Sequence, residues 1–314
     1  MHLGVGQLGL HPAEIAAAEA LSLLGLQFDQ RGVAVVHGIG AHGHALALAD
    51  ALLLGEVVLQ QELRVHHKAQ AAVCAVVAGI LVSGGLHGNG IPENSMAAFR
   101  AALEQGYGIE LDIHLMKDGN LAVIHDSSLK RTAGADVNIT DLTTEELPGY
   151  PLEGTEEIIP TFDQVLALFA GKAPLIIELK ADGNNHKALA DAAVKAMEGY
   201  EGPWCMESFD PRCIHALKKH HPQVIRGQLT EDYFQVNSPL HPALRFVLKH
   251  NMLNFMTCPD FIAYNFSHRK NTLSNFLCRK VWDIQGVTWT LRSQEDHDTA
   301  VKEGWLPIFE NYNP

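Results

Sequence analysis

The chain has 314 residues, of which 47% are hydrophobic and 19% charged, and its formal net charge at pH 7 is -13. This composition is ordinary for a globular protein, and the length is sufficient for one large α/β domain or two smaller ones. The acidic excess argues against electrostatic binding to nucleic acid or to an anionic membrane, since both need an excess of Lys and Arg. The five cysteines include no C-x-x-C pair, so neither a disulfide framework nor a zinc site is indicated.

The first 84 residues differ in composition from the rest of the chain. They hold one aromatic residue, Phe28, three basic residues and seven of the 18 histidines. A few regular elements are predicted in this part, namely helices at 12–24 and 44–54 and a strand at 32–37. A segment with so few large side chains can form only a thin core. We therefore interpret residues 1–76 as a poorly defined N-terminal extension and residues 77–314 as the main domain.

Two patterns in the N-terminal part need a functional interpretation. Gly38, Gly40 and Gly43 have the G-x-G-x-x-G spacing of a dinucleotide site, but the surrounding sequence offers at most one βαβ unit, so we interpret the spacing as coincidental. The apolar run at 71–86 is about the shortest that could span a bilayer, and it ends in glycines. The first residues lack the cationic start of a signal peptide. These features predict a cytoplasmic protein without membrane insertion.

From residue 85 onward, predicted strands and helices alternate, which is typical of a largely parallel sheet covered by helices. Helices are predicted at 95–104 (with Asn94 as N-cap), 161–170, 186–197, 211–220, 240–250 and 294–303. Strands are predicted at 78–82, 107–115, 121–125, 175–179, 204–208, 224–229, near Phe255, at 287–291 and at 306–310. These nine strands are one more than a closed (β/α)8 barrel requires. One of them is therefore expected to be a hairpin arm or an error.

The strand at 107–115 is predicted to have one charged face. Because alternate residues of a strand share a face, Glu110, Asp112 and His114 lie on one side and apolar residues on the other. After a turn, the following strand ends at His125. A buried pair of carboxylates two residues apart repels itself unless a positive group lies between them. A hard divalent cation is the natural partner for such a pair.

The strand at 175–179 repeats this arrangement, because Glu178 and Lys180 share a face at the C-terminal end of an apolar run. One such strand would equally fit a sheet edge with a solvated face, but two strands with charge at matching ends favour a common site. In a (β/α)8 barrel, catalytic groups lie at the C-terminal ends of the strands. The same mouth would be rimmed by polar and aromatic residues at further strand ends, namely Glu207, Ser208, Gln228 and Trp289.

Several residues near these ends have a structural as well as a functional interpretation. His114 is expected to fill the barrel rather than bind a metal. Asp126 points to the opposite face from His125 and is expected to cap the following loop. Glu207 either helps to bind metal and order substrate or has a structural role, and Trp289 walls a substrate pocket or fills the barrel. The polar loop at 127–160 is expected to lie over the mouth, where it could act as a lid.

Several ordered motifs carry a family resemblance. They are IPENSMAAFRAALEQGYGIELDIHLMKDGNLAVIHDSSLKRTAG, then IPTFDQVLALF, PLIIELK, ESFDP and GVTWTLRSQED. Together they are similar to the glycerophosphodiester phosphodiesterase family, and the resemblance covers residues 85–314. It implies a (β/α)8 TIM barrel with a role in glycerol and lipid metabolism. The implied reaction is hydrolysis of a small-molecule glycerophosphodiester to sn-glycerol 3-phosphate and an alcohol, with one divalent cation, Mg²⁺ or Ca²⁺.

The resemblance also implies roles for individual residues. Glu110, Asp112 and Glu178 match the metal ligands of the family, which agrees with the oxygen ligands that hard cations prefer. Lys180 matches the lysine that contacts the substrate phosphate. His125 matches one of two histidines that act as general acid and base. The implied mechanism uses the glycerol 2-hydroxyl as internal nucleophile and passes through a cyclic phosphate that water then opens.

The sequence departs from the family pattern at the end of the first barrel strand. The family has His-Arg-Gly there, whereas this chain has Ser83 and Gly84 ahead of Gly85. Serine cannot replace an imidazole as acid or base near neutral pH. Three explanations stay open: His87 on the following loop substitutes for the histidine, the protein is a degenerate homologue that binds metal or phosphodiester with little turnover, or residues 1–84 are mistranslated after a frameshift in the gene.

Overall fold

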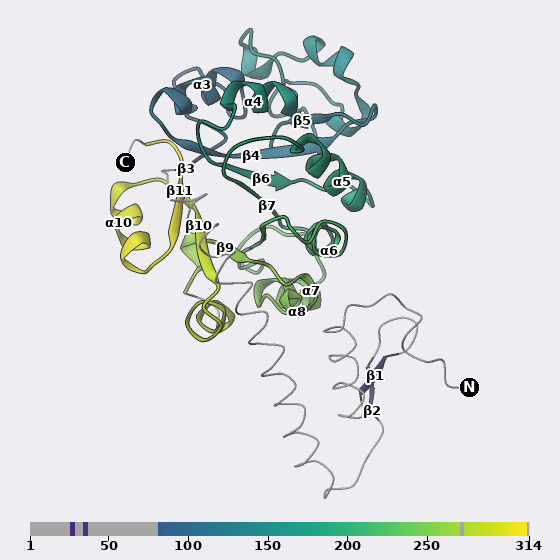
Figure 1. Cartoon of the computed structure of the whole chain (residues 1–314), viewed down its shortest axis with the longest axis vertical. Helices are drawn as coiled ribbons and strands as arrows, with labels where there is room; N and C mark the ends of the chain where they lie inside the picture. Colours follow the sequence, from purple (N-terminus) through teal and green to yellow (C-terminus); the bar gives the residue numbers. More distant parts are fainter. Residues whose placement is uncertain (1–25, 29–33, 37–80, 271–272, 313) are drawn as a thin grey trace, which may run out of the picture. The chain divides into compact units, whose positions relative to one another are not determined.

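The computed structural model describes residues 26–28, 34–36, 81–270, 273–312 and 314 (Figure 1). The chain divides into two compact units, Met1–Lys68 and Ala69–Pro314. In the first unit, β1 (Leu26–Phe28) and β2 (Ala34–Val36) pair in antiparallel fashion. The strand β2 lies within the strand predicted at 32–37, whereas the helices predicted at 12–24 and 44–54 lie outside the described residues.

The second unit is a closed barrel of eight parallel strands (Figure 1). The strands lie around the barrel in the order in which they occur in the sequence. The ring closes because the first strand pairs with both the second and the last. A ninth strand, β5 (Leu121–Val123), pairs antiparallel with β4 and is the predicted hairpin arm. The eight barrel strands are β3 (Leu81–Ser83), β4 (Gly108–Leu115), β6 (Leu175–Leu179), β7 (Trp204–Ser208), β8 (Arg226–Thr230), β9 (Phe261–Asn265), β10 (Gln285–Leu291) and β11 (Leu306–Phe309).

Helices surround this barrel and connect its strands. Six of them occupy the predicted positions to within two residues at each end: α3 (Met96–Glu104), α4 (Phe162–Phe169), α5 (His186–Ala196), α6 (Pro211–His220), α7 (Pro242–Lys249) and α10 (Gln294–Lys302). The shorter elements that were not predicted include α8 (Asn254–Thr257), α9 (Leu273–Phe276), the 3₁₀ turn η5 (Phe266–His268) and the π-helical turn η6 (Leu277–Val281). Among the described residues, no helix is long and apolar enough to cross a membrane.

Two local predictions were wrong. The strand expected near Phe255 is the short helix α8, and the barrel strand is β9, a few residues later. The N-cap of α3 is Ser95, whose Oγ accepts the N–H of Ala98 (3.1 Å), and not Asn94. Asn94 instead donates its Nδ2 hydrogen to Asp112 Oδ2 (2.9 Å). A side chain committed to a partner distant in sequence is not available to cap its own helix.

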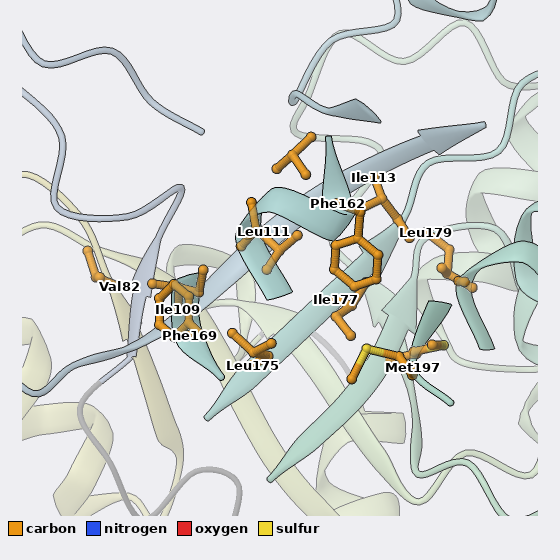
Figure 2. Close-up of a cluster of buried hydrophobic side chains, with 14 of the residues drawn as sticks. Val82, Ile109, Leu111, Ile113, Phe162, Phe169, Leu175, Ile177, Leu179 and Met197 are labelled. Carbon is orange, nitrogen blue, oxygen red and sulfur yellow. The ribbon is translucent and has the colours of Figure 1, made fainter. Parts of the chain in front are cut away.

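The alternation of the strands separates two faces, as predicted. Outward residues of β4 and β6, such as Ile109, Leu111 and Ile177, pack against Phe162 and Phe169 of α4 (Figure 2). Inward side chains of the strands form a second apolar cluster that makes the barrel floor, and two of its members, Leu229 and Ile308, reach the cavity above it. The cluster consists of Leu81, Ile176, Cys205, Leu229, Phe261, Ala263, Val287 and Ile308. Because every second residue of a strand points to the same face, the next inward residues of the strands form a layer above this floor. That layer is polar.

The excursion between β4 and α4 has a small core of its own. It packs Met116, Ile124, Leu129, Ile139 and Leu147 together with other buried residues. Three 3₁₀ turns run through it, at Ile139–Asp141, Thr144–Gly149 and Leu152–Gly154. The segment at 127–160 is thus a packed unit with buried apolar residues, and its role as a lid stays a prediction.

Truncation of Phe169 tests the outer core. Phe169 is fully buried and meets Phe99 edge to face, with 6.4 Å between the ring centroids. Phe169→Ala is expected to lower the free energy of unfolding, measured by urea denaturation, by about 3 to 5 kcal/mol. Phe255→Ala is the matched control, because 68% of that side chain is exposed. Its effect should stay within about 0.5 kcal/mol, and equal effects of the two variants would contradict this packing.

Candidate active site

A cavity of about 360 Å³ opens at the C-terminal ends of the barrel strands. It is lined by all the residues proposed as metal ligands, proton carriers or substrate contacts: His87, Glu110, Asp112, His125, Glu178, Lys180 and Trp289. Glu207 lines it as well, whereas Ser208 and Gln228, which were also expected at the mouth, do not and instead donate to backbone carbonyl oxygens. Ser83 and Gly84 line it as well. Strands distant in sequence therefore bring all these groups to one place, because parallel strands end at the same edge of the barrel.

Three carboxylates form the centre of the cavity. One oxygen from each of Glu110, Asp112 and Glu178 lies within 4.8 Å of the others, and all three residues are buried. The register places Asp112 directly beside Glu178, on the neighbouring strands β4 and β6. Lys180 Nζ lies between them, 3.0 Å from Asp112 Oδ1 and 2.9 Å from Glu178 Oε1. Its backbone N–H extends the strand pairing by bonding Ile113 O (3.0 Å).

The electrostatics of this cluster are unbalanced. Burial, reinforced by the neighbouring carboxylate of Asp112, raises the pKa of Glu110 well above its usual value. Burial also raises the pKa of Glu178 to about 7, despite the contact with Lys180. For Asp112 burial acts in the same direction, but the Lys180 ammonium and the Asn94 hydrogen bond together lower its pKa. The Lys180 ammonium thus offsets the effect of burial on the pKa of Asp112, but it does not offset this effect for Glu110 or Glu178.

Glu207 adds a fourth carboxylate to the same wall. Its side chain is 1% exposed, and Oε2 has no hydrogen-bond partner among the residues that the structure describes. Burial, followed by the charge of Glu178, raises the pKa of Glu207 well above its usual value. An unpartnered buried carboxylate oxygen beside three further carboxylates is costly unless a cation is bound. The all-oxygen donor set therefore fits a hard divalent cation.

His125 belongs to a chain of polar contacts on the cavity wall. Its Nδ1 lies 2.6 Å from Asp126 Oδ1, and Arg131 Nε donates to Asp126 Oδ2 (2.6 Å). Arg131 is also paired with Glu93. The interpretation of Asp126 as a loop cap facing away from His125 was wrong. The strand β5 ends at Val123, so its alternation no longer determines the direction of these two side chains.

The position of His114 agrees with its interpretation as a barrel residue. It is buried, and its Nε2 lies 3.3 Å from the carbonyl oxygen of His125. Burial lowers the pKa of His114, so its ring is neutral at pH 7. This contact links the end of β4 to the residue that follows β5. A neutral ring in this place supports the backbone that holds His125.

The contacts of Asp126 predict an acid-sensitive part of the fold. The hydrogen bond from Arg131 lowers the pKa of Asp126 to about 2. Because its pKa is lower in the folded than in the unfolded state (about 3.9), ionised Asp126 stabilises the fold above about pH 4, and this is lost as the pH falls towards 2. In thermal denaturation, Asp126→Asn should have a lower Tm than the parent at pH 7. Below pH 4 the Tm values of the two proteins should approach each other. A difference independent of pH would contradict the assignment.

The first barrel strand contributes no imidazole at its end. Ser83 Oγ donates to Glu110 Oε2 (2.8 Å), and Gly84 adopts a positive φ of 61°. His87, four residues on, lies in the cavity wall with 13% of its side chain exposed, and its Nε2 is 3.6 Å from Glu310 Oε1. Glu310 also accepts a hydrogen bond from Arg292 (2.6 Å). His87 and His125 thus each face a carboxylate that is held by an arginine.

Comparison with known proteins identifies the family of the chain. The model of the glycerophosphoryl diester phosphodiesterase family matches residues 85–312. The chain belongs to this family. Members of the family are phosphoric diester hydrolases, and the match begins directly after Ser83 and Gly84.

Individual proteins of known sequence or structure are also similar to this chain. A glycerophosphodiester phosphodiesterase of Caldanaerobacter subterraneus subsp. tengcongensis is 30% identical over 227 residues, which are 68% of this chain and 86% of that protein. The phosphodiesterase of Oleispira antarctica, solved in complex with sn-glycerol-3-phosphate, superposes with a TM-score of 0.61 at 21% identity and covers 74% of this chain and 93% of its own. The Thermotoga maritima glycerophosphodiester phosphodiesterase gives 0.56 at 25% identity, covering 73% of this chain and 93% of its own. These likenesses support the same barrel fold.

Some residues of the cavity were not singled out from the sequence. Arg131 and Arg292 place two guanidinium groups on the wall, and Asn94 orients Asp112. Arg131 could have been singled out from the sequence, because it lies in a motif of the family resemblance and close to His125. Arg292 lies just after β10, where the C-terminal end of a barrel strand is itself a usable signal. The same two signals apply to Glu93, which stands in the first of the quoted motifs, and to Glu310, which follows β11 directly.

Proposed function

We propose that the protein hydrolyses glycerophosphodiesters to sn-glycerol 3-phosphate and an alcohol with the help of one divalent cation. The observation that carries the proposal is the buried cluster of Glu110, Asp112 and Glu178 around Lys180 at the mouth of the barrel. Membership of the phosphodiesterase family and the glycerol phosphate bound to the Oleispira antarctica enzyme support the substrate class. The identity of the ion and a cytoplasmic location stay predictions.

The metal would be held by Glu110, Asp112 and Glu178, with Glu207 close by. Mg²⁺ or Ca²⁺ bound there would lower the pKa of a hydroxyl group and neutralise phosphate charge. The four carboxylates alone would repel a phosphodiester, so the anionic substrate needs positive charge at this place. Lys180 supplies one such charge, and Arg131 and Arg292 bring two more to the wall of the cavity.

His125 is suited to move a proton in this reaction. Asp126 is ionised at neutral pH and can only accept hydrogen bonds, so the short contact between them requires a hydrogen on Nδ1. The neutral ring then has Nε2 available to accept a proton. As general base or acid, His125 would take the proton of the attacking glycerol 2-hydroxyl or protonate the leaving alkoxide, with a cyclic phosphate between the two steps.

His87 is our candidate for the second proton carrier. It lines the cavity and faces Glu310, and Arg292 holds Glu310 as Arg131 holds Asp126. Trp289 forms a further wall, with its ring edge to face against Phe209 and its Nε1 without a partner among the described residues. This apolar surface with an unpartnered N–H donor supports our proposal that Trp289 contacts the glycerol part of the substrate.

A second function follows from Ser83 and Gly84. Without the imidazole and guanidinium of the family motif, the site could bind metal and phosphodiester with little turnover, because losing one acid or base typically costs about 10² to 10⁴ in rate. The hydrogen bond from Ser83 to Glu110 favours this alternative, since it ties the serine to the carboxylate cluster. The two candidate functions predict different values of kcat, but both predict that the site binds a metal ion.

Release of glycerol 3-phosphate from glycerophosphocholine, with Mg²⁺, Ca²⁺ or EDTA, tests the proposal. EDTA and His125→Asn are each expected to lower kcat at least about 100-fold. His87→Asn should cause a similar loss if His87 carries the second proton. His220→Asn, an exposed histidine on α6 outside the cavity, is the control and should leave kcat unchanged. Full activity of His125→Asn would refute the assignment, and inactivity of a metal-binding parent would favour the impaired homologue.

A further inference from the structure

The end of β10 contains an irregularity that changes the direction of its last side chains. Between Thr288 and Leu291, β10 advances three residues where its partner β11 advances two. One extra residue in a paired strand is a β-bulge, and a bulge beside a site re-aims a side chain. Strict alternation would put Val287 and Leu291 on one face, but Val287 belongs to the barrel floor and Leu291 to the outer core. Because of this reversal, the next residue, Arg292, faces the cavity and lines it.

The bulge places Arg292 close to the position where the family motif has its arginine. The strands β10, β11 and β3 are consecutive neighbours in the barrel. Arg292 follows β10, Glu310 follows β11, and Gly84 follows β3. Arg292 donates to Glu310 Oε2 (2.6 Å), and the pairing of β11 with β3 extends to the residue before Glu310. Arg292 and Gly84 therefore belong to the same wall of the cavity, with one strand between them, and Gly84 has no side chain of its own to offer there.

Arg292 also has more unused donors than the other cations of the cavity. Lys180 lies between two carboxylates of the three-carboxylate cluster, and Arg131 is paired with two further carboxylates. Arg292 is bonded to Glu310 through one terminal nitrogen, and 65% of its side chain is exposed. Its Nε and second terminal nitrogen have no hydrogen-bond partner among the residues that the structure describes. A guanidinium with such free N–H groups can bind a phosphate at two oxygens.

We propose that Arg292 binds the phosphate of the substrate and so replaces the arginine that is missing at position 84. Glu310 is then a positioning residue, because it fixes one end of the guanidinium and leaves the other donors for the substrate. This inference rests on the proposed function, since the phosphate is that of the glycerophosphodiester. It goes further in assigning the contact to one residue of β10, where the bulge makes the contact possible.

Binding of sn-glycerol 3-phosphate to the full chain, measured by calorimetry with Mg²⁺ or Ca²⁺ present, tests this inference. Arg292→Gln is expected to raise Kd about 10- to 100-fold, and Arg292→Lys should raise it less, because lysine keeps the charge but loses the planar fork. Glu310→Gln should also raise Kd less, since its amide oxygen can still accept the hydrogen bond from Arg292. Arg212→Gln is the matched control. Arg212 is an exposed arginine paired with a carboxylate on α6, outside the cavity, and its loss should leave Kd unchanged.

Gly84→Arg provides a rescue experiment. It should restore most of the affinity that Arg292→Gln loses but add less to the parent, because two arginines would then share one phosphate. Equal effects of Gly84→Arg in both backgrounds would overturn the proposal. So would an unchanged Kd of Arg292→Gln, or equal losses in Arg292→Gln and Glu310→Gln, which would mean that Arg292 only holds Glu310 beside His87.

The readout is binding, so the outcome is distinct from that of the proposed hydrolysis. A parent that binds sn-glycerol 3-phosphate through Arg292 but does not turn over glycerophosphocholine would refute the hydrolysis and support this inference. A parent that hydrolyses the diester while Arg292→Gln keeps the Kd of the parent would do the reverse. A parent that does not bind sn-glycerol 3-phosphate would refute both.

Discussion

The double variant Ser83→His with Gly84→Arg is expected to release glycerol 3-phosphate from glycerophosphocholine with a kcat about 10² to 10⁴ times that of the parent. Both positions line the cavity, and Ser83 already contacts Glu110 at its centre. A histidine there would add a proton carrier beside the carboxylate cluster. The arginine would add a bidentate donor for the substrate phosphate.

A side chain at position 84 has a modest cost. A Cβ at Gly84 would have its nearest contact with Glu93 Cβ at 3.4 Å, which is an ordinary separation. The positive φ of 61° at Gly84 costs a residue with a side chain about 1 to 2 kcal/mol. Tm should therefore fall slightly while kcat rises.

Single variants and a control complete this experiment. Ser83→His alone should recover most of kcat, and Gly84→Arg alone should act mainly on KM, because one restores proton transfer and the other restores phosphate binding. Ser83→Ala, which removes only the hydrogen bond to Glu110, should not raise kcat. A folded double variant with unchanged kcat would mean that the cavity residues assigned here do not form the catalytic site.

Metal binding provides the second large effect. Mg²⁺ or Ca²⁺ at about 100 times its Kd is expected to stabilise the parent by about 2.7 kcal/mol, which corresponds to a rise in Tm of about 5 to 10 °C for a domain of this size. The physical reason is the unbalanced negative charge of Glu110, Glu178 and Glu207 around one ammonium. Thermal denaturation with EDTA, Mg²⁺ or Ca²⁺ measures the shift.

Glu110→Gln should abolish most of this metal-dependent shift. The same variant should not lower Tm in EDTA, because it removes a like charge from the cluster while the amide can still accept the hydrogen bond from Ser83. Glu310→Gln is the matched control, since Glu310 lines the same cavity but lies outside the three-carboxylate cluster. A shift that survives Glu110→Gln, or that Glu310→Gln also removes, would place the metal elsewhere.

The local sequence pattern was sufficient to predict much of the fold. The bounds of β6, β7 and α6 were predicted to the residue, because strong apolar runs and a Pro at the start of a helix act within a few residues. The strand β9 was missed because Phe255 and Met256 of the nearby helix α8 are also apolar, and a short apolar run does not distinguish helix from strand. The helix cap at Ser95 was missed because the side chain of the adjacent Asn94 binds Asp112, a partner in another strand.

For this protein, the sequence by itself determined the barrel, its hairpin arm and the inward direction of Glu110, Asp112 and Glu178, because strand alternation is set by the local backbone. The tertiary structure alone decided which groups contact one another beyond the strand ends. The pairing of Asp126 with His125 and Arg131 depends on the path of the loop after β5, and the contact of His87 with Glu310 depends on barrel closure. The contact between His87 and Glu310 joins residues far apart in the chain, and the contacts of Asp126 lie in a loop, so side-chain periodicity carries no information about either.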